Sequence, residues 1–553
     1  MNKTLLIVLI FCSGYLKLSA QMPFSTMDSV DINNIVATSL VHGDMWWNPA
    51  TGTAACEFPK GSGKNCNFAS SIWMSGYDGG NNLHIAAQTY RQAGNDYWPG
   101  PLDASDTLTY ATSTSWAKIW KVNLTDIQTF QALATHTATN TPQSILAWPG
   151  KGNTYAQGNG GVALTITTDM APFVDLNGNG IYEPLLGEYP AIKGNQALWW
   201  VFSDNGPAHN LTNGKPLGIE VHAMAYGYTR GTLIDDVVYY EYTMINKSSN
   251  NYSNFRISQW DDFFIGYGEF DNYIGFDSIW RMAIIYKANN DDGSMGGFPV
   301  NSYGLNPPQT AITMIVLPGD EGTNYVAAGS FDYFNNDNSI IGNPAVDTEC
   351  NNYMRAKLKN GQHFTDNFTG AGASCTGYGS GPNTNYVFTG DPSIDTQWSE
   401  CVCANPPGDR RFVLSSNDFT FNSGSSEKVV FALLVADSAK GCPVANFDSI
   451  KIVADTAWGN YFQQATAIKK VSVNNAINIY PNPAHDKLFI ENAGYNSWEA
   501  TITIYNTLGQ KINAPVNKNG QKYEADISRL PCGLYNVLYR NGDMQTTARF
   551  VKE

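Results

Sequence analysis

The 553-residue chain is long enough for about three or four domains of roughly 150 residues each, so it can bury a large core. Only 15% of its residues are charged and the net charge is −15, which argues against nucleic-acid binding because phosphate neutralisation requires clustered Lys and Arg. A surface finished with Asn, Ser, Thr, Gly and Tyr instead of Lys and Glu is typical of extracellular β proteins.

The first 20 residues have the pattern of a secretory signal peptide. Lys3 precedes an apolar run over residues 5–11, and small residues follow before Gln21. The run is well short of the roughly 20 residues that cross a bilayer, so a membrane anchor is the weaker interpretation. We therefore expect cleavage after Ala20 and delivery of the mature chain to the periplasm.

From residue 21 onward, short apolar and aromatic runs alternate with Gly, Asn, Asp and Pro clusters, which predicts a mainly β body with long irregular loops. We divide this body into an N-terminal β-rich region, 21–165, and a larger β-rich region, 166–464. The clearest elements are two strands and two short peripheral helices, expected over 233–245, 427–435, 126–135 and 449–468. Asp448 would cap the last helix.

Nine cysteines are present and only Cys12 lies in the signal peptide, so eight remain in an oxidising compartment, where disulfides are expected. Cys56 and Cys66 flank a Gly/Lys loop that a disulfide would close. Four more cysteines lie in the irregular stretch 335–409, which is longer than loops normally run and would be stapled by them. A zinc site formed by Cys401 and Cys403 with His363 is the weaker alternative, because a single residue between two cysteine ligands is an unusual spacing for zinc.

The segment 175–188 has oxygen-bearing side chains at alternate positions and Gly at the sixth place, the spacing with which a tight loop wraps Ca²⁺. The candidate ligands are Asp175, Asn177, Asn179, Glu183 and Glu188. The twelfth position is Leu instead of a bidentate Glu, so the loop departs from an EF-hand. We predict a structural calcium site here, and the alternative is an Asn/Gly-rich turn held by its own side chains.

A second acidic cluster begins after Trp260. Its carboxylates would repel one another without a cation, so Asp262, Asp271 and Asp277 are expected to share a second calcium, with a solvated acidic loop as the alternative. The same carboxylates lie among aromatic residues and would suit glycoside hydrolysis, which needs two carboxylates at a set separation. No HExxH, GxSxG, phosphate-loop or dinucleotide motif is present. A binding, adhesion or structural module is therefore favoured over a secreted polysaccharide hydrolase.

Histidine and paired aromatic residues give weaker signals. His209 and His222 lie near Asp204 in the sequence, and a structural role for them is favoured over a metal or acid–base role. Three aromatic pairs would line a carbohydrate groove if they were exposed, although one ring of such a pair is usually buried. They are Trp46–Trp47, Tyr97–Trp98 and Trp199–Trp200.

A linker at 465–475 is followed by a separate unit, 476–553, whose short alternating strands predict an independent β-sandwich. Its motifs are YPNP, the IYN and LGQ segments, a GLY turn and a terminal RFVK. They include Tyr480, Pro481, Asn482, Pro483, Gly509, Gly533 and Tyr535. In order and spacing these motifs resemble the type A sorting domain of type IX secretion. Cys532 departs from the pattern, in which a small residue is usual at that position.

The resemblance implies an immunoglobulin-like sandwich, recognition by the type IX secretion machinery and passage across the outer membrane. The protein would then be released or attached to surface lipopolysaccharide. Segments of the body, among them FPKGSGKNC and DLNGNGIYEP, are similar to segments of large secreted proteins that carry this domain. Because that family has no assigned activity, this similarity does not indicate a reaction. We expect a secreted or cell-surface protein, with structural calcium and a glycan or a host or matrix ligand for its body.

Overall fold

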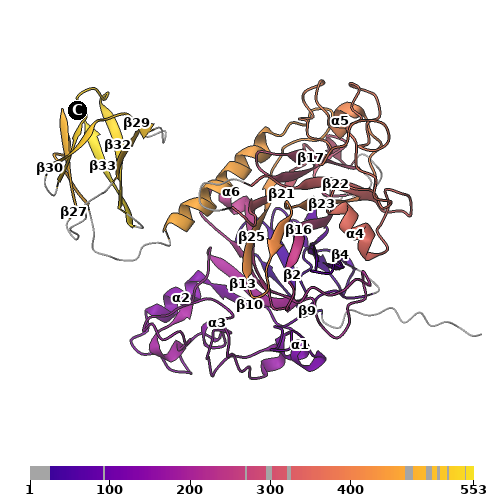
Figure 1. Cartoon of the computed structure of the whole chain (residues 1–553), viewed down its shortest axis with the longest axis horizontal. Helices are drawn as coiled ribbons and strands as arrows, with labels where there is room; N and C mark the ends of the chain where they lie inside the picture. The colour runs from indigo at the N-terminus through magenta and orange to yellow at the C-terminus, as the bar shows by residue number, and fades with distance from the viewer. Residues whose placement is uncertain are drawn as a thin grey trace, which may run out of the picture. The chain divides into compact units, whose positions relative to one another are not determined.

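The computed structural model describes residues 25–90, 94–267, 271–293, 302–320, 326–467, 477–492, 501–506, 511–519, 522–541 and 544–553. The predicted signal peptide, Gly509 and most of the predicted linker lie outside the described residues. Chain contacts divide the protein into two compact units, Met1–Tyr461 and Phe462–Glu553 (Figure 1). The prediction of a mainly β protein is confirmed, because antiparallel sheets make up most of both units.

A nine-stranded antiparallel sheet forms the centre of the first unit, in the order β10-β13-β14-β15-β25-β21-β18-β17, with β9 paired to β13 (Figure 1). Its long apolar strands are buried on both faces, so each face packs against its own hydrophobic core. The strands are β9 Trp98–Pro99, β10 Trp120–Asn123, β13 Gln196–Ser203, β14 Ile219–Gly227, β15 Val237–Asn246, β17 Asn272–Asp277, β18 Met282–Lys287, β21 Gln309–Val316 and β25 Ser426–Ala436.

A six-stranded antiparallel sheet packs against one face of the nine-stranded sheet. Its order is β22-β23-β16-β7-β8, with β24 paired to β16. Phe331 of the six-stranded sheet stacks on Phe276 of β17, with ring centroids 5.2 Å apart. The strands are β7 Ala69–Tyr77, β8 Leu83–Ala87, β16 Tyr252–Asp262, β22 Ser330–Asn335, β23 Arg410–Ser415 and β24 Phe419–Phe421.

The other face of the six-stranded sheet, which we call the outer face, carries several aromatic and charged side chains. Directly paired residues share a face, and alternate residues along a strand share it too. The register pairs Ser258 with Trp73 and Asp262 with Arg411, and this places Trp260 on the same face as these four residues. Helix α4, Asp347–Tyr353, lies over this face, where the Ser75 hydroxyl bonds to its Asn351 side chain at 2.9 Å.

The second face of the nine-stranded sheet is covered mainly by helices and loops. Helix α6, Asp448–Ala467, buries Ile450, Val453 and Ala457 in that core, and its Ala457 carbonyl accepts a hydrogen bond from Tyr239 at 2.8 Å. The predicted helix is therefore present but is not peripheral. The other helices are α1 Tyr110–Trp116, α2 Leu124–Gln131, α3 Gln143–Leu146 and α5 Glu400–Cys403, with 3₁₀ turns at Asn159–Gly161, Pro184–Leu186 and Leu233–Asp236.

The predicted strand at 233–245 begins later than expected, because its first residues form the last of these 3₁₀ turns before β15. Short strands complete the first unit. A four-stranded sheet is formed by β1 Met27–Val30, β2 Val36–Leu40, β5 Cys56–Glu57 and β6 Asn65–Asn67. Three strand pairs are β3 Trp47–Asn48 with β4 Thr53–Ala54, β11 Phe173–Val174 with β12 Tyr189–Pro190, and β19 Asp291–Asp292 with β20 Gly304–Leu305.

The second unit contains two four-stranded antiparallel sheets, β26-β27-β31-β30 and β29-β28-β32-β33, which share one apolar core. This arrangement is the predicted β-sandwich. The strands are β26 Ile477–Tyr480, β27 Lys487–Asn492, β28 Thr501–Asn506, β29 Lys511–Ile512, β30 Val516–Asn519, β31 Lys522–Asp526, β32 Gly533–Asn541 and β33 Met544–Lys552.

Candidate functional site

The predicted calcium loop lies between β11 and β12 and gathers its oxygen-bearing side chains. Both oxygens of Asp175 accept backbone N–H bonds, from Gly178 at 2.7 Å and from Gly180 at 2.8 Å. The Glu183 carboxylate accepts from the side-chain amides of Asn177 and Asn179, at 2.9 and 2.7 Å. The loop is therefore ordered by its own polar groups, and the five predicted ligands lie along one turn of chain.

Charge is unbalanced in this loop. Glu188 is fully buried and accepts the backbone N–H groups of Leu176 and Glu183 at 3.1 and 2.8 Å. The pKa of Asp175 is lowered, mainly by the Gly180 N–H bond, so this carboxylate is ionised at neutral pH. Among the described residues, no Lys or Arg forms an ion pair with Asp175, Glu183 or Glu188.

The second acidic cluster is arranged differently from the prediction. Asp271 directly precedes β17 and Asp277 is its last residue, so six steps of about 3.3 Å along the extended chain separate them by roughly 20 Å. They cannot share one calcium ion with Asp262. The prediction of a common site is therefore wrong, and the physical reason is that the intervening segment is an extended strand instead of a loop.

Each of these carboxylates pairs with a different basic residue, which a second carboxylate shares. Asp271 lies 2.5 Å from the ammonium group of the buried Lys287, and Asp277 lies 3.4 Å from Lys451 of α6. Asp262 accepts from Arg411 at 2.9 Å. Across the described chain, no group of three or more His, Cys, Asp or Glu side chains is arranged to hold a metal ion.

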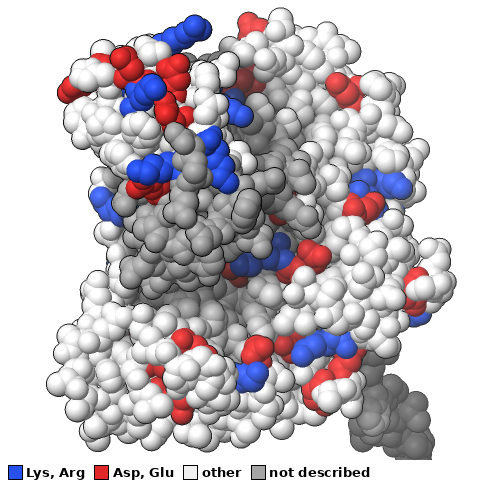
Figure 2. Space-filling view, turned by 60° about the vertical axis from the view of Figure 1, so that its left-hand side comes forward, with Lys and Arg blue, Asp and Glu red and all other residues white. Residues whose placement is uncertain are grey.

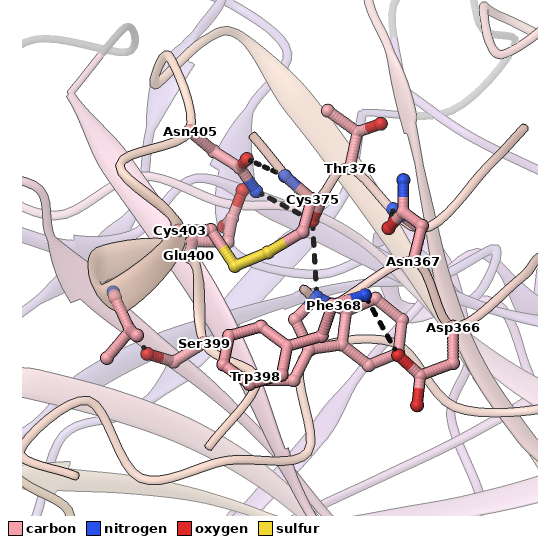
Figure 3. Close-up of a disulfide and its surroundings, with 12 residues drawn as sticks. Asp366, Asn367, Phe368, Cys375, Thr376, Trp398, Ser399, Glu400, Cys403 and Asn405 are labelled. Atoms are coloured by element: carbon pink, nitrogen blue, oxygen red, sulfur yellow. Dashed lines mark hydrogen bonds between the residues drawn. A yellow bond between two sulfur atoms is a disulfide. The ribbon is translucent and has the colours of Figure 1, made fainter. Parts of the chain in front are cut away.

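The cysteines of the irregular stretch staple it with two disulfides, Cys375–Cys403 and Cys401–Cys442. Cys401 and Cys403 are both consumed in these bonds, which removes the zinc alternative. Figure 3 shows the Asn405 side chain against the backbone of Cys375, where it accepts from the Cys375 N–H at 3.0 Å and donates to its carbonyl at 3.1 Å. The indole N–H of Trp398 donates to the same carbonyl at 3.2 Å.

The other four cysteines of the described residues are not bonded. Cys56 and Cys66 lie on the paired strands β5 and β6 with their sulfur atoms 2.9 Å apart, which leaves them adjacent and unbonded. Cys350 is buried and Cys532 is exposed. The loop closure expected at Cys56 and Cys66 remains a prediction.

His209, His222 and the paired aromatics lie in mostly buried positions. The ring nitrogens of His209 lie 3.6 Å from the buried Asp96 and 4.0 Å from the buried Asp204, and His222 contacts Glu220 at 2.8 Å. All six rings of the three predicted aromatic pairs are at least 95% buried. These pairs therefore do not line an exposed groove.

An aromatic cavity of about 310 Å³ lies on the outer face of the six-stranded sheet. Its floor is formed by Trp73, Trp260 and Phe334, which are almost fully buried. The planes of the two indoles are within 8° of parallel, with ring centroids 6.1 Å apart. Tyr90 lies 6.1 Å from Trp260 and completes the wall, and Arg411 also lines the cavity.

The rim of the cavity is polar and open to solvent. Asn336 and Ala345 are exposed, and the amide of Asn343 donates to the Asn336 side chain at 2.7 Å. None of the described residues that line the cavity carries a carboxylate. Figure 2 shows charged side chains in small mixed groups on the face drawn, with most of that face uncharged.

Sequence reasoning identified only Trp260 of the cavity residues. The remaining walls come from segments around residues 73, 90, 334 and 411, which lie far apart in the chain. The available signal was the alternation of Trp260 and Asp262 along β16, which predicts that both face the same side. Their partners across the sheet depend on strand order and register, which no local pattern encodes.

The sorting motif surrounds the edge of the C-terminal sandwich. Asn482 bridges to β33, because its amide donates to the Arg549 carbonyl at 3.0 Å and its oxygen accepts from the Val551 N–H at 2.8 Å. The Tyr535 hydroxyl donates to the Pro531 carbonyl at 2.9 Å. These bonds connect the YPNP segment to the terminal RFVK strand, which explains why the two motifs occur together.

Residues 478–553 match the family model described as the secretion system C-terminal sorting domain. No curated protein matches the chain. A solved polysaccharide lyase is similar at 11% identity with a TM-score of 0.16, over 60% of this chain and 34% of that one. The chain thus spans about a third of that structure, and so low a TM-score supports no argument. No described helix is long and apolar enough to cross a membrane.

Proposed function

Because the chain carries a type IX secretion sorting domain and is exported to the cell surface or the medium, we propose that its body is a calcium-stabilised binding or adhesion module. The proposal of a calcium site rests on a contrast between the two acidic regions. Asp262, Asp271 and Asp277 each have a basic partner, whereas the carboxylates of 175–188 have none among the described residues. A cation bound by these carboxylates together with the side-chain oxygens of Asn177 and Asn179 would supply that partner.

Binding is favoured over hydrolysis by the placement of the same residues. A glycosidase needs two carboxylates facing one bond, at about 5–10 Å from each other. Asp262 and Asp271 are instead engaged by Arg411 and Lys287, and the cavity lining contains no described carboxylate.

Thermal melting of the purified secreted chain tests the proposal. Addition of calcium to the EDTA-treated protein should raise the melting temperature, because a ligand that binds only the folded state stabilises it by mass action. Magnesium at the same concentration should raise it less, since a flexible loop of many oxygens suits the larger ion. An unchanged melting temperature at millimolar calcium would contradict the proposal.

A further inference from the structure

We propose that the aromatic cavity of the outer face binds a neutral pyranose ring, the ligand class of the binding module. This inference rests on the proposed binding function but not on the calcium loop, which lies in another part of the fold. Four observations support it: the shape of the floor, an unsatisfied donor, the charge balance and the composition of the rim.

The floor is suited to a flat ligand with an apolar face. Trp73 and Trp260 stack with nearly parallel indole planes and form the floor together with Phe334, and Tyr90 closes the side. Aromatic rings contribute large apolar contact area in a fixed geometry. A volume of about 310 Å³ lies at the lower end of small-molecule sites, which fits one ring and not an extended polymer segment.

One hydrogen-bond donor in the floor is unsatisfied. The indole N–H of Trp260 is buried and has no acceptor among the described residues, whereas that of Trp73 donates to the Gln88 carbonyl at 2.8 Å. Buried N–H groups are nearly always paired in native proteins, so an orphan donor beside a cavity indicates a missing acceptor. A ring or hydroxyl oxygen of a sugar would supply it.

The charges around the cavity disfavour two other classes of ligand, quaternary ammonium groups and anions. None of the described residues that line the cavity carries a carboxylate, so a quaternary ammonium group would find no counter-charge in it. An anion would find no free positive charge, because Arg411 already donates to Asp409 at 2.6 Å and to Asp262 at 2.9 Å. A neutral ligand avoids both penalties.

The rim supplies partners for hydroxyl groups. Thr89, Asn336 and Asn343 line the opening with side chains that both donate and accept. Part of their hydrogen-bonding capacity is already used, since the side-chain amide of Asn336 donates to Asp409 at 2.6 Å. A polyhydroxylated ring, apolar on its face and polar around its edge, matches a cavity with an aromatic floor and an amide-rich rim.

Saturation-transfer NMR on the full secreted chain tests the inference. The probes are an equimolar mixture of methyl β-glucopyranoside, methyl β-galactopyranoside, methyl α-mannopyranoside, glucuronate and choline. We expect saturation of at least one neutral pyranoside, strongest at ring C–H protons, and none of glucuronate or choline. Failure of all three pyranosides to receive saturation would overturn the inference, as would saturation of glucuronate or choline in their place.

Variants localise the binding. Ala345→Trp, at an exposed rim position, should abolish the pyranoside signal, whereas Ala111→Trp on the exposed surface of α1 should leave it unchanged. Trp260→Phe keeps an aromatic ring without the N–H and should weaken binding about two- to tenfold. The matched control is Trp200→Phe, since the Trp200 indole N–H is also buried without an acceptor but lies outside the cavity. A signal that persists in Ala345→Trp would overturn the inference.

Calcium-dependent melting is recorded on the same preparations. Ala345→Trp should retain the calcium effect while losing the pyranoside signal. Failure of the sugar assay with calcium stabilisation intact would therefore reject only the ligand class. Loss of calcium stabilisation with the sugar signal intact would reject only the calcium proposal.

Discussion

The guanidinium of Arg411 lies 2.9 Å from the carboxylate of Asp262, and this pair joins β23 to β16 directly behind the aromatic cavity. Burial raises the pKa of Asp262 to about 6, against the opposing effects of the Arg411 charge and the Tyr90 hydroxyl. The ion pair therefore only partly offsets the cost of removing a carboxylate from water. Stability in this region consequently depends on pH.

We predict that Asp262→Asn removes a pH dependence from folding. In the folded state the pKa is about 6, above the ordinary value of 3.8, so the folded form binds the proton more tightly. The stabilisation from this group is present below pH 4 and is lost as the pH rises through 6, by about 3 kcal/mol. Urea denaturation of both proteins between pH 4 and 7 should show this loss in the wild type relative to the variant; parallel profiles would contradict it.

We predict that Asp175→Asn abolishes the rise in melting temperature caused by calcium, because the variant loses a charged oxygen ligand from the loop. Asp103→Asn is the matched control. Asp103 is an exposed residue whose carboxylate likewise accepts backbone N–H bonds, from Ser105 at 2.8 Å and Thr107 at 3.1 Å, so its replacement tests loss of a turn bond alone. The control should melt slightly lower yet keep its calcium response. An equal response in both variants would count against the loop as the site.

We predict a third disulfide between Cys56 and Cys66 in the exported protein, since their sulfur atoms are 2.9 Å apart on paired strands and the compartment is oxidising. Closure of so short a loop should stabilise the fold by up to about 3 kcal/mol. Mass spectrometry of the chain alkylated in denaturant without reduction should find both residues unlabelled. The exposed Cys532 should be labelled under the same conditions; labelling of Cys56 would refute the third bond.

We predict that deletion of residues 476–553 retains the body in the periplasm, because the sorting domain is the part recognised for export. Cell fractionation and immunoblotting would measure the distribution. The control is Cys532→Ser, which changes an exposed residue of the same domain and should be exported normally. Appearance of the truncated body in the medium in normal amounts would disprove the prediction.

Much of the architecture follows from local patterns. The apolar run EKVVFALLV predicts a buried strand, and β25 spans it with one further residue at each end. The spacing of apolar residues predicts α6 to within one residue at each end, but not its burial, because the sheet face that covers Ile450 and Val453 is built from distant segments. Local periodicity thus identifies an element and leaves its neighbours undetermined.

The candidate sites show the same limit more clearly. The 175–188 loop could be anticipated because its polar groups are close in sequence and bond to one another. Asp271 and Asp277 are also close in sequence, which predicted that they lie together. The extended strand between them separates them, and each pairs with a different lysine. Arg411 and Lys451 are far from their partners in the sequence, and Lys287 reaches Asp271 only through the register of β17 with β18, so these ion pairs could not be foreseen.

The two disulfides also determine how the protein would respond to proteases outside the cell. Cys401 and Cys403 occupy one short helix but bind partners on opposite sides of it in the sequence, Cys375 and Cys442. A single backbone cut between 376 and 400, or between 404 and 441, leaves the two fragments covalently joined. The nicked molecule would keep its strands β23 and β25 in place. Cleavage in these loops would therefore break the backbone once without releasing a fragment.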